Sequence, residues 1–204
     1  ENMRAFNSML VLLAQAQGSL VSVAGLARDI RLSEPSVARY LDILEATYGG
    51  HAVHSHGANL ANELKKSRKH SFVDLGIRNM LLKDFSSVAA RRDRGPILES
   101  FVALAILRAL PPNAELRFWR TRSGSEVDFV LVKDRIPYPI EVKAGADAGE
   151  IPPGLAKFLA AYPEAPGAIV YTEHPGGSAV CAGRDVRFLD VSDAEACPFL
   201  AARG

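Results

Sequence analysis

Two acidic residues lie inside strongly apolar runs that have the pattern of strands. Of all features of this 204-residue sequence, they most limit the folds that it can adopt. Asp128 lies within the run 126–132, and Glu141 lies within the run 137–143, where Lys143 follows it by two positions. Side chains alternate between the two faces of a strand, so Glu141 and Lys143 share a face while their apolar neighbours point the other way. A carboxylate among buried apolar groups is costly unless another group compensates it. The two runs therefore predict a site and not a plain core.

The polar turn 133–135 joins these strands, so a hairpin can bring Asp128 and Glu141 together beside Lys143. Two neighbouring carboxylates repel each other, and their hard oxygens suit Mg²⁺ or Mn²⁺. A bound metal lowers the pKa of its water and stabilises charge on a phosphoryl group, and a nearby ammonium adds to that stabilisation. The pattern predicts metal-dependent phosphodiester hydrolysis. The alternative is a buried structural ion pair between Lys143 and one of the acids.

The second half of the chain has the pattern of an α/β domain. An apolar helix is predicted over residues 96–110, where Pro111 and Pro112 end it. The order of the predicted elements is α-β-β-β-α-β-β, which indicates a mixed sheet flanked by helices. The remaining predictions are strands over 116–120, 126–132, 137–143, 168–171 and 186–191, and a helix over 153–162.

The first half has the periodicity of helices. Ser22 and Ser33 are placed as N-caps, and Pro35 falls in the first turn of the helix that Ser33 begins. A helix-turn-helix followed by two short strands predicts a winged helix over residues 1–90, and a helical spacer is the alternative. The predicted elements are helices over 3–16, 22–28, 33–48 and 74–82 and strands over 51–55 and 70–73, with a linker over 86–94. Gly49 and Gly50 end the third helix.

The acids and the lysine resemble a known motif. Asp128, twelve further residues and then Glu141-Val142-Lys143 are similar to the PD-(D/E)xK motif of restriction-endonuclease-like folds, and Glu99 matches the acid on that fold's first helix. The stretch Phe118–Val130 resembles the C-terminal region of bacterial and archaeal AAA-type P-loop ATPases, in which a winged helix precedes the nuclease-like domain. The resemblance implies a winged-helix domain over 1–90 and a nuclease-like domain over 91–204.

The same resemblance implies roles for four residues. Glu99, Asp128, Glu141 and Lys143 would be catalytic, and the three acids would hold Mg²⁺ or Mn²⁺. DNA would be the partner. Two departures matter: Val127 stands where the motif's name has proline, and no G-x-x-x-x-G-K-[ST] occurs, so no nucleotide site is assigned. The alternative function is an inactive nuclease-fold docking module that positions an ATPase on a protein or DNA partner.

Charge along the chain favours the same class of partner. Residues 63–94 hold nine Lys or Arg against four Asp or Glu, a local charge of +5 in a chain whose net charge is +1. Such a stripe suits a polyanion, although a solvated face gives the same pattern. The predicted nucleic-acid contacts are Ser36 and Arg39 on the recognition helix and Lys65, Lys66, Arg68 and Lys69 near the wing.

Apolar runs, the N-terminal pattern and the cysteines indicate where in the cell the protein is expected. No apolar run approaches the roughly 20 residues that span a bilayer, and the N-terminus lacks the pattern of a secretory signal. Cys181 and Cys197 form neither a metal-ligand spacing nor a disulfide framework. We therefore expect a cytoplasmic protein without a membrane partner. Because the chain begins with Glu1 instead of Met, we expect a piece of a longer chain that also carries the P-loop ATPase domain.

Overall fold

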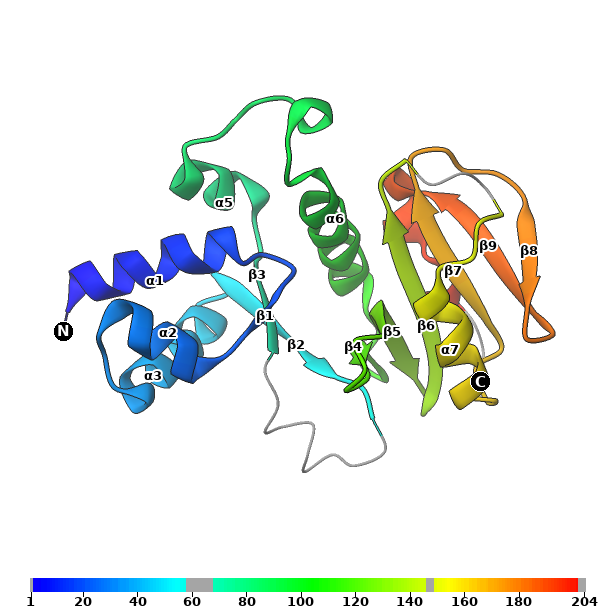
Figure 1. Ribbon diagram of the computed structural model, residues 1–204, viewed down its shortest axis with the longest axis horizontal. Helices are drawn as coiled ribbons and strands as arrows, with labels where there is room; N and C mark the ends of the chain where they lie inside the picture. The colour runs from blue at the N-terminus through cyan, green and yellow to red at the C-terminus, as the bar shows by residue number, and fades with distance from the viewer. Residues whose placement is uncertain (1, 58–67, 146–148, 202–204) are drawn as a thin grey trace. The chain divides into compact units, whose positions relative to one another are not determined.

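The computed structural model describes residues 2–57, 68–145 and 149–201, and the chain has a mixed α/β fold (Figure 1). It divides into two compact units. The first comprises Glu1–His54 and Leu60–Ser100, and the second comprises Ser55–Asn59 and Phe101–Gly204. The boundary falls inside one helix, between Ser100 and Phe101. Within the described residues, no helix is long and apolar enough to cross a bilayer.

The first unit contains the helices and the hairpin that the sequence predicts, in the order α-β-α-α-β-β-α. β3 pairs antiparallel with both β2 and the two-residue β1. Figure 1 labels the helices and strands of this unit, which are α1 Met3–Gln15, β1 Leu20–Val21, α2 Val23–Ile30, α3 Glu34–Ala46, β2 Gly50–Ser55, β3 Arg68–Phe72 and α5 Leu75–Leu82. The short 3₁₀ helix η1 Val88–Ala90 follows α5.

Local capping explains where these helices begin. The Ser22 hydroxyl accepts a hydrogen bond from the Gly25 backbone N–H at 3.0 Å, which satisfies a donor that the first turn of α2 leaves unpaired. Ser33 does the same for the Ser36 N–H, and Asp74 caps α5. Apolar residues at helical spacing then pack into one buried cluster, which contains Met9, Leu13, Ala14, Leu26, Ala27, Val37, Leu41 and Phe72.

The last residues of the segment 86–94, which the sequence predicts as a linker, form ion pairs with a buried arginine of α5 and with each other. Arg78 on α5 and Arg91 after η1 are 2% and 7% exposed. The carboxylate of Asp93 accepts hydrogen bonds from both guanidinium groups, at 2.6 Å from Arg78 and 2.8 Å from Arg91. Arg91 also donates to the backbone oxygen of Asp84 at 2.7 Å. These bonds hold the pKa of Asp93 well below its ordinary value, first through the bond from Arg91. Arg91 and Asp93 are therefore tied to α5 by buried charge, whereas residues 86–90 are exposed.

Replacing Asp93 with Ala is expected to destabilise the protein by about 2–3 kcal/mol, because it leaves two buried guanidinium groups without their shared carboxylate. Urea denaturation of the purified chain at neutral pH measures this loss. Asp84→Ala is the control, since that side chain is 43% exposed and an exposed ion pair contributes less than about 1 kcal/mol. Equal losses in the two variants would contradict a central role for Asp93.

The second unit is built on a mixed sheet with the strand order β4-β5-β6-β7-β9-β8. β5 pairs antiparallel with both β4 and β6. β7 pairs parallel with both β6 and β9, and β8 returns antiparallel to β9. The elements are α6 Arg94–Ala109, whose first turns belong to the first unit, β4 Ala114–Arg120, β5 Glu126–Lys133, β6 Ile136–Lys143, α7 Pro153–Ala161, β7 Gly167–Thr172, β8 Ser178–Cys181, β9 Arg184–Asp190, η2 Val191–Ala196 and α8 Pro198–Ala201.

A two-residue turn sets the register of the central hairpin. Asp134 and Arg135 both have positive φ, at 51° and 69°, as a type I′ turn requires. The turn pairs Lys133 with Ile136, and the ladder continues to Phe129 opposite Ile140. The predicted strands and helices of this half are confirmed, whereas β8, η2 and α8 were not predicted.

The face of the sheet that carries α7 has an apolar core. Trp119 is 7% exposed and packs edge-on against Phe158 at 5.4 Å, so it is a core residue, as strand aromatics usually are. Gly154 fixes the start of α7 against the start of β5, because a methyl group there would overlap the backbone oxygen of Glu126. This contact holds α7 beside the strand that carries Asp128.

Candidate functional site

The hairpin of β5 and β6 brings three of the predicted residues together. Continuing the ladder by one residue places Asp128 beside Glu141. The backbone N–H of Val142 donates to Oδ2 of Asp128 at 2.9 Å, which fixes that carboxylate against the neighbouring strand. The ammonium nitrogen of Lys143 lies 3.0 Å from Oε2 of Glu141 and 3.9 Å from Oδ2 of Asp128. These three residues form the acid–lysine cluster.

The charges in the acid–lysine cluster are unequally buried. The Asp128 and Glu141 side chains are 6% and 3% exposed, whereas the Lys143 side chain is 42% exposed. Burial, followed by the charge of Asp128 and a hydrogen bond with it, raises the pKa of Glu141 to about 9, and Lys143 opposes that rise. Without a further cation, Glu141 therefore keeps a proton at neutral pH. One half-exposed ammonium does not compensate two buried carboxylates.

The acid–lysine cluster fits a divalent metal ion. Oε2 of Glu141 is buried and accepts no aligned hydrogen bond from the described residues, although the Lys143 ammonium lies close to it. Two adjacent carboxylates are hard oxygen ligands, and Mg²⁺ is commonly held by one or two carboxylates with water filling the other positions. The described residues contain no group of three or more His, Cys, Asp or Glu that could hold a metal. A cation here would rest on Asp128 and Glu141.

Glu99 has a cation within its own unit. It lies on the part of α6 that belongs to the first unit, and its Oε2 is 4.0 Å from the Nζ of Lys69 on β3. The Lys69 side chain is only 8% exposed, so its ammonium is poorly placed to contact a phosphate, and we exclude it from the proposed interface. The role of Glu99 as a third metal ligand stays a prediction.

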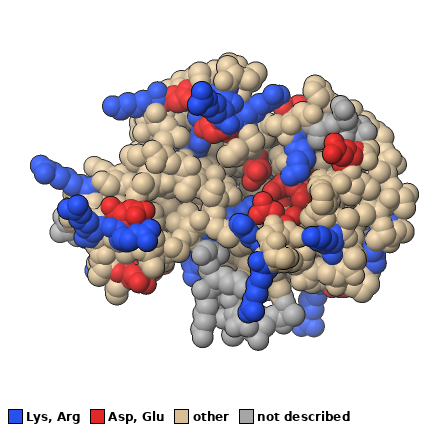
Figure 2. Space-filling view, in the orientation of Figure 1, with Lys and Arg blue, Asp and Glu red and all other residues tan. Residues whose placement is uncertain are grey.

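The other predicted nucleic-acid contacts lie on two elements of the first unit. On α3, the Ser36 hydroxyl is 2.8 Å from the Ser33 hydroxyl, and Arg39 is exposed. Arg68 is half-buried at the start of β3. Lys65 and Lys66 lie outside the described residues. Figure 2 shows that basic side chains are scattered over the face that it draws and are interleaved with acidic ones.

A group of cations near the acid–lysine cluster was not singled out from the sequence. Arg120 and Arg122 flank the start of the turn between β4 and β5, and both are exposed. Lys157 on α7 donates to the Ser125 hydroxyl at 2.8 Å in the same turn. β5 begins there and β6 ends there, so these cations lie at the end of the sheet that carries Lys143. The sequence does show a Ser-Gly turn with charged residues beside it. That these charges lie near a cation of α7 depends on the packing of α7 against the turn, which the sequence does not predict.

Two family models match the chain. Residues 94–176 match a family described as "Domain of unknown function (DUF4143)", a domain often found in proteins associated with AAA ATPases. Residues 1–88 match "Domain of unknown function (DUF8612)". Each match covers less than half of the chain.

Curated relatives are also uncharacterised. An uncharacterised protein of Mycobacterium tuberculosis and another of Mycobacterium bovis are each 31% identical to this chain over 134 residues. The match covers 65% of this chain but only 30% of each relative, so the chain spans about a third of the length of the curated relatives it matches. No solved structure matches the chain.

Proposed function

We propose that the chain binds DNA and cleaves its phosphodiester backbone with Mg²⁺ or Mn²⁺, as the C-terminal portion of an AAA-type ATPase. The acid–lysine cluster is the observation that carries the proposal, because it combines two buried acids, of which Glu141 keeps its proton at neutral pH, and an adjacent ammonium at one end of a sheet. Clusters of this kind, with strongly perturbed pKa values, concentrate at functional sites.

Each residue of the acid–lysine cluster has a distinct task in this proposal. Asp128 and Glu141 would hold the metal, which when bound supplies an acidified water and stabilises charge on the phosphoryl group. The hydrogen bond from Val142 keeps Asp128 in place before any ligand arrives. Lys143 lies close enough to both acids to direct its ammonium at the developing negative charge of the phosphate. The exposed Arg120, Arg122 and Lys157 would contact neighbouring phosphates.

The first unit would supply most of the affinity as a winged helix. The element order α1-β1-α2-α3-β2-β3 supports this proposal, with α3 as the recognition helix and β2 and β3 as the wing. Ser36 and Arg39 lie in the first half of α3, where side chains reach bases or phosphates. Arg68 begins the second wing strand, next to the predicted contacts Lys65 and Lys66.

Removing Arg39 or Arg68 is expected to flatten the salt dependence of DNA binding. Each phosphate contact that is lost lowers the slope of log K against log salt by about 1. Fluorescence anisotropy of a labelled duplex, titrated with the whole chain at several salt concentrations, measures that slope for Arg39→Ala and Arg68→Ala. The control is Arg108→Ala, whose side chain is 64% exposed on α6. A slope that stays unchanged in both test variants would remove α3 and the wing from the interface.

One observation favours a second function, an inactive nuclease-fold docking module. Within the described residues, no third carboxylate joins Asp128 and Glu141 in a metal-holding group. If Glu141 held a proton and no metal bound, the domain would keep its fold but could not cleave a phosphodiester by the metal-dependent route. The module would then position an ATPase on a protein or DNA partner.

The deciding experiment offers the whole chain single-stranded and duplex DNA and RNA. Each substrate is incubated with Mn²⁺, with Mg²⁺ or with EDTA, and products are resolved on denaturing gels. Cleavage that requires the metal supports the nuclease. DNA binding without any cleavage or metal response favours the docking module, and neither binding nor cleavage would overturn both proposals for nucleic acid.

A further inference from the structure

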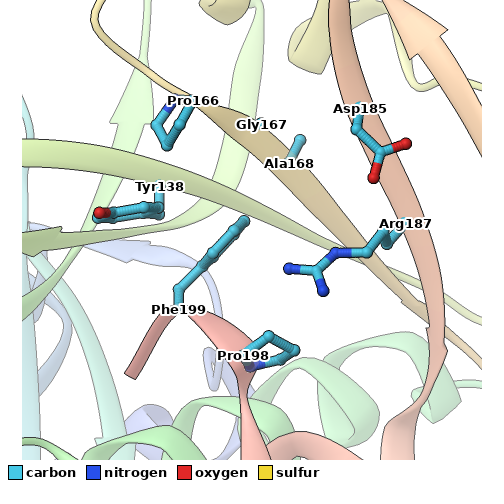
Figure 3. Close-up of a pocket in the computed structure, with 8 residues that line it drawn as sticks. All are labelled: Tyr138, Pro166, Gly167, Ala168, Asp185, Arg187, Pro198 and Phe199. Atoms are coloured by element: carbon cyan, nitrogen blue, oxygen red, sulfur yellow. The ribbon is translucent and has the colours of Figure 1, made fainter. Parts of the chain in front are cut away.

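A cavity lies in the second unit, away from the acid–lysine cluster (Figure 3). It has a volume of about 340 Å³. Tyr138 on β6, Gly167 on β7, Arg187 on β9 and Phe199 on α8 line it. A cavity of this size falls within the range of small-molecule sites, which are mostly apolar with a few placed polar groups.

The topology separates this cavity from the acid–lysine cluster. Tyr138 and Glu141 are three residues apart on β6, so their side chains lie on opposite faces of the sheet. Gly167 begins β7, whereas Thr172 at the far end of β7 pairs with Lys143. The cavity therefore lies on the other face of the sheet and at the other end of the parallel strands.

Arg187 is the side chain that gives the cavity its chemistry. It is half-buried, and its guanidinium carbon is 5.7 Å from the centre of the Phe199 ring. The Phe199 ring in turn packs on Tyr138 at 4.7 Å. A cation over an aromatic face is attracted to the ring, and this contact leaves the guanidinium N–H groups available to a ligand. Figure 3 shows the group directed toward Phe199 and the space beside it.

The guanidinium of Arg187 has no anionic partner among the described residues. None of their carboxylates lies within ion-pair distance of it, and none of their oxygens accepts a hydrogen bond from it. Asp185 is on the same face of β9 and lines the same cavity, but no ion pair joins its carboxylate to the guanidinium. By contrast, the two buried arginines of the first unit are both paired with Asp93. Arg187 is thus a half-buried cation with unused donors in a cavity.

We propose that this cavity binds a small anionic ligand, a carboxylate or phosphate ester carried on a flat apolar body. The planar fork of Arg187 matches either anion with two parallel hydrogen bonds. The apolar body would pack against Tyr138, Phe199 and Pro198, which line the same space. This inference is independent of the proposed nuclease activity, because the site shares no residue with the acid–lysine cluster.

Three small probes test the proposal by NMR titration of the ¹⁵N-labelled chain. Benzoate and phenyl phosphate present the two anions on one ring, and benzamide is the neutral analogue of the same shape. The anions are expected to shift the Gly167 and Ala168 amides with dissociation constants of about 1 mM, and benzamide is expected to bind at least about tenfold more weakly. The relative affinity of benzoate and phenyl phosphate distinguishes a carboxylate site from a phosphate site.

Arg187→Gln removes the charge, and Arg135→Gln in the exposed β5–β6 turn removes the same charge elsewhere in the unit. The first variant is expected to lose at least about tenfold in affinity for the anions, and the second is expected to bind as the wild type does. Equal binding of benzamide and benzoate to the wild type would overturn the proposal without reference to any variant. Shifts that persist in Arg187→Gln, or that occur away from the cavity, would overturn it as well.

Discussion

Asp128→Asn and Lys143→Ala are each expected to lower metal-dependent cleavage of DNA by at least about 100-fold, while the affinity for DNA stays within about twofold. Asp128 would be lost as a metal ligand, and Lys143 would be lost as a partner of the developing phosphate charge. Neither loss should act through affinity, because the first unit and the exposed cations supply most of the phosphate contacts in the proposal. The cleavage rate should therefore fall in both variants while the affinity for DNA stays nearly unchanged.

Asn is chosen at position 128 because it removes the charge but can preserve the local structure. Its side-chain oxygen can still accept the Val142 N–H that Asp128 accepts at 2.9 Å, so the register of β5 and β6 should survive. The Lys143 side chain is 42% exposed, so its truncation leaves no cavity in the core. Single-turnover cleavage and anisotropy binding, measured on the same preparations, give the two quantities.

Arg135→Ala is the control for these variants, since it removes an exposed cation at the opposite end of β6 and should cleave as the wild type does. Cleavage at an undiminished rate in both Asp128→Asn and Lys143→Ala would mean that the reaction occurs at another site or comes from a contaminant. A parallel loss of cleavage and of affinity would mean that the acid–lysine cluster holds substrate instead of acting on it.

Much of the fold could be predicted because its signals are local. Ser22 and Ser33 are caps whose partners lie three residues away, and Asp134 and Arg135 occupy a two-residue turn that fixes a hairpin. Strand alternation then brought Asp128 to Glu141, since the register that a short turn imposes leaves little freedom. For this hairpin, the strand alternation, the two-residue turn and the cost of burying a carboxylate all predict the same pairing of Asp128 with Glu141.

The remaining features depend on contacts between residues distant in sequence. Nothing near Arg91 indicates that it is buried with Arg78, because the compensating bonds come from the way α5 and the following segment pack. Glu99 matches the position of the helix acid in the nuclease-like pattern, yet it lies 4.0 Å from Lys69, thirty positions away in the sequence. The Arg187 cavity needs β6, β7, β9 and the four-residue α8, and no single-segment pattern predicts α8.

Glu141→Gln is expected to stabilise the metal-free protein at pH 8 by about 2–4 kcal/mol and to change its stability little at pH 5. Burial and the charge of Asp128 raise the pKa of Glu141 to about 9 from an ordinary value near 4.5. The folded protein therefore binds a proton that the unfolded chain releases as the pH rises through this window. The free energy of unfolding falls accordingly between pH 4.5 and 9, and Gln has no proton to lose.

The comparison must be made between the variant and the wild type at each pH. His70 is buried, and burial together with the charges of Arg68, His54 and His51 lowers its pKa to about 4. The unfolded chain then binds the extra proton between about pH 4 and 6.5, so His70 lowers stability as the pH falls. This effect opposes that of Glu141 in the wild type, and it cancels when the two proteins are compared.

A divalent cation should reverse the order of stability. Mn²⁺ that displaces the proton from Glu141 stabilises the folded wild type by mass action, more at pH 8 than at pH 5 because protons compete for the same carboxylates. Glu141→Gln should respond little, since an amide is a weak ligand for a hard cation. Thermal melting with Mn²⁺ or EDTA at both pH values gives four curves for each protein. If Glu141 only forms a structural ion pair with Lys143, the variant loses stability at pH 8 and neither protein responds to Mn²⁺, which would remove the metal site and leave the docking module.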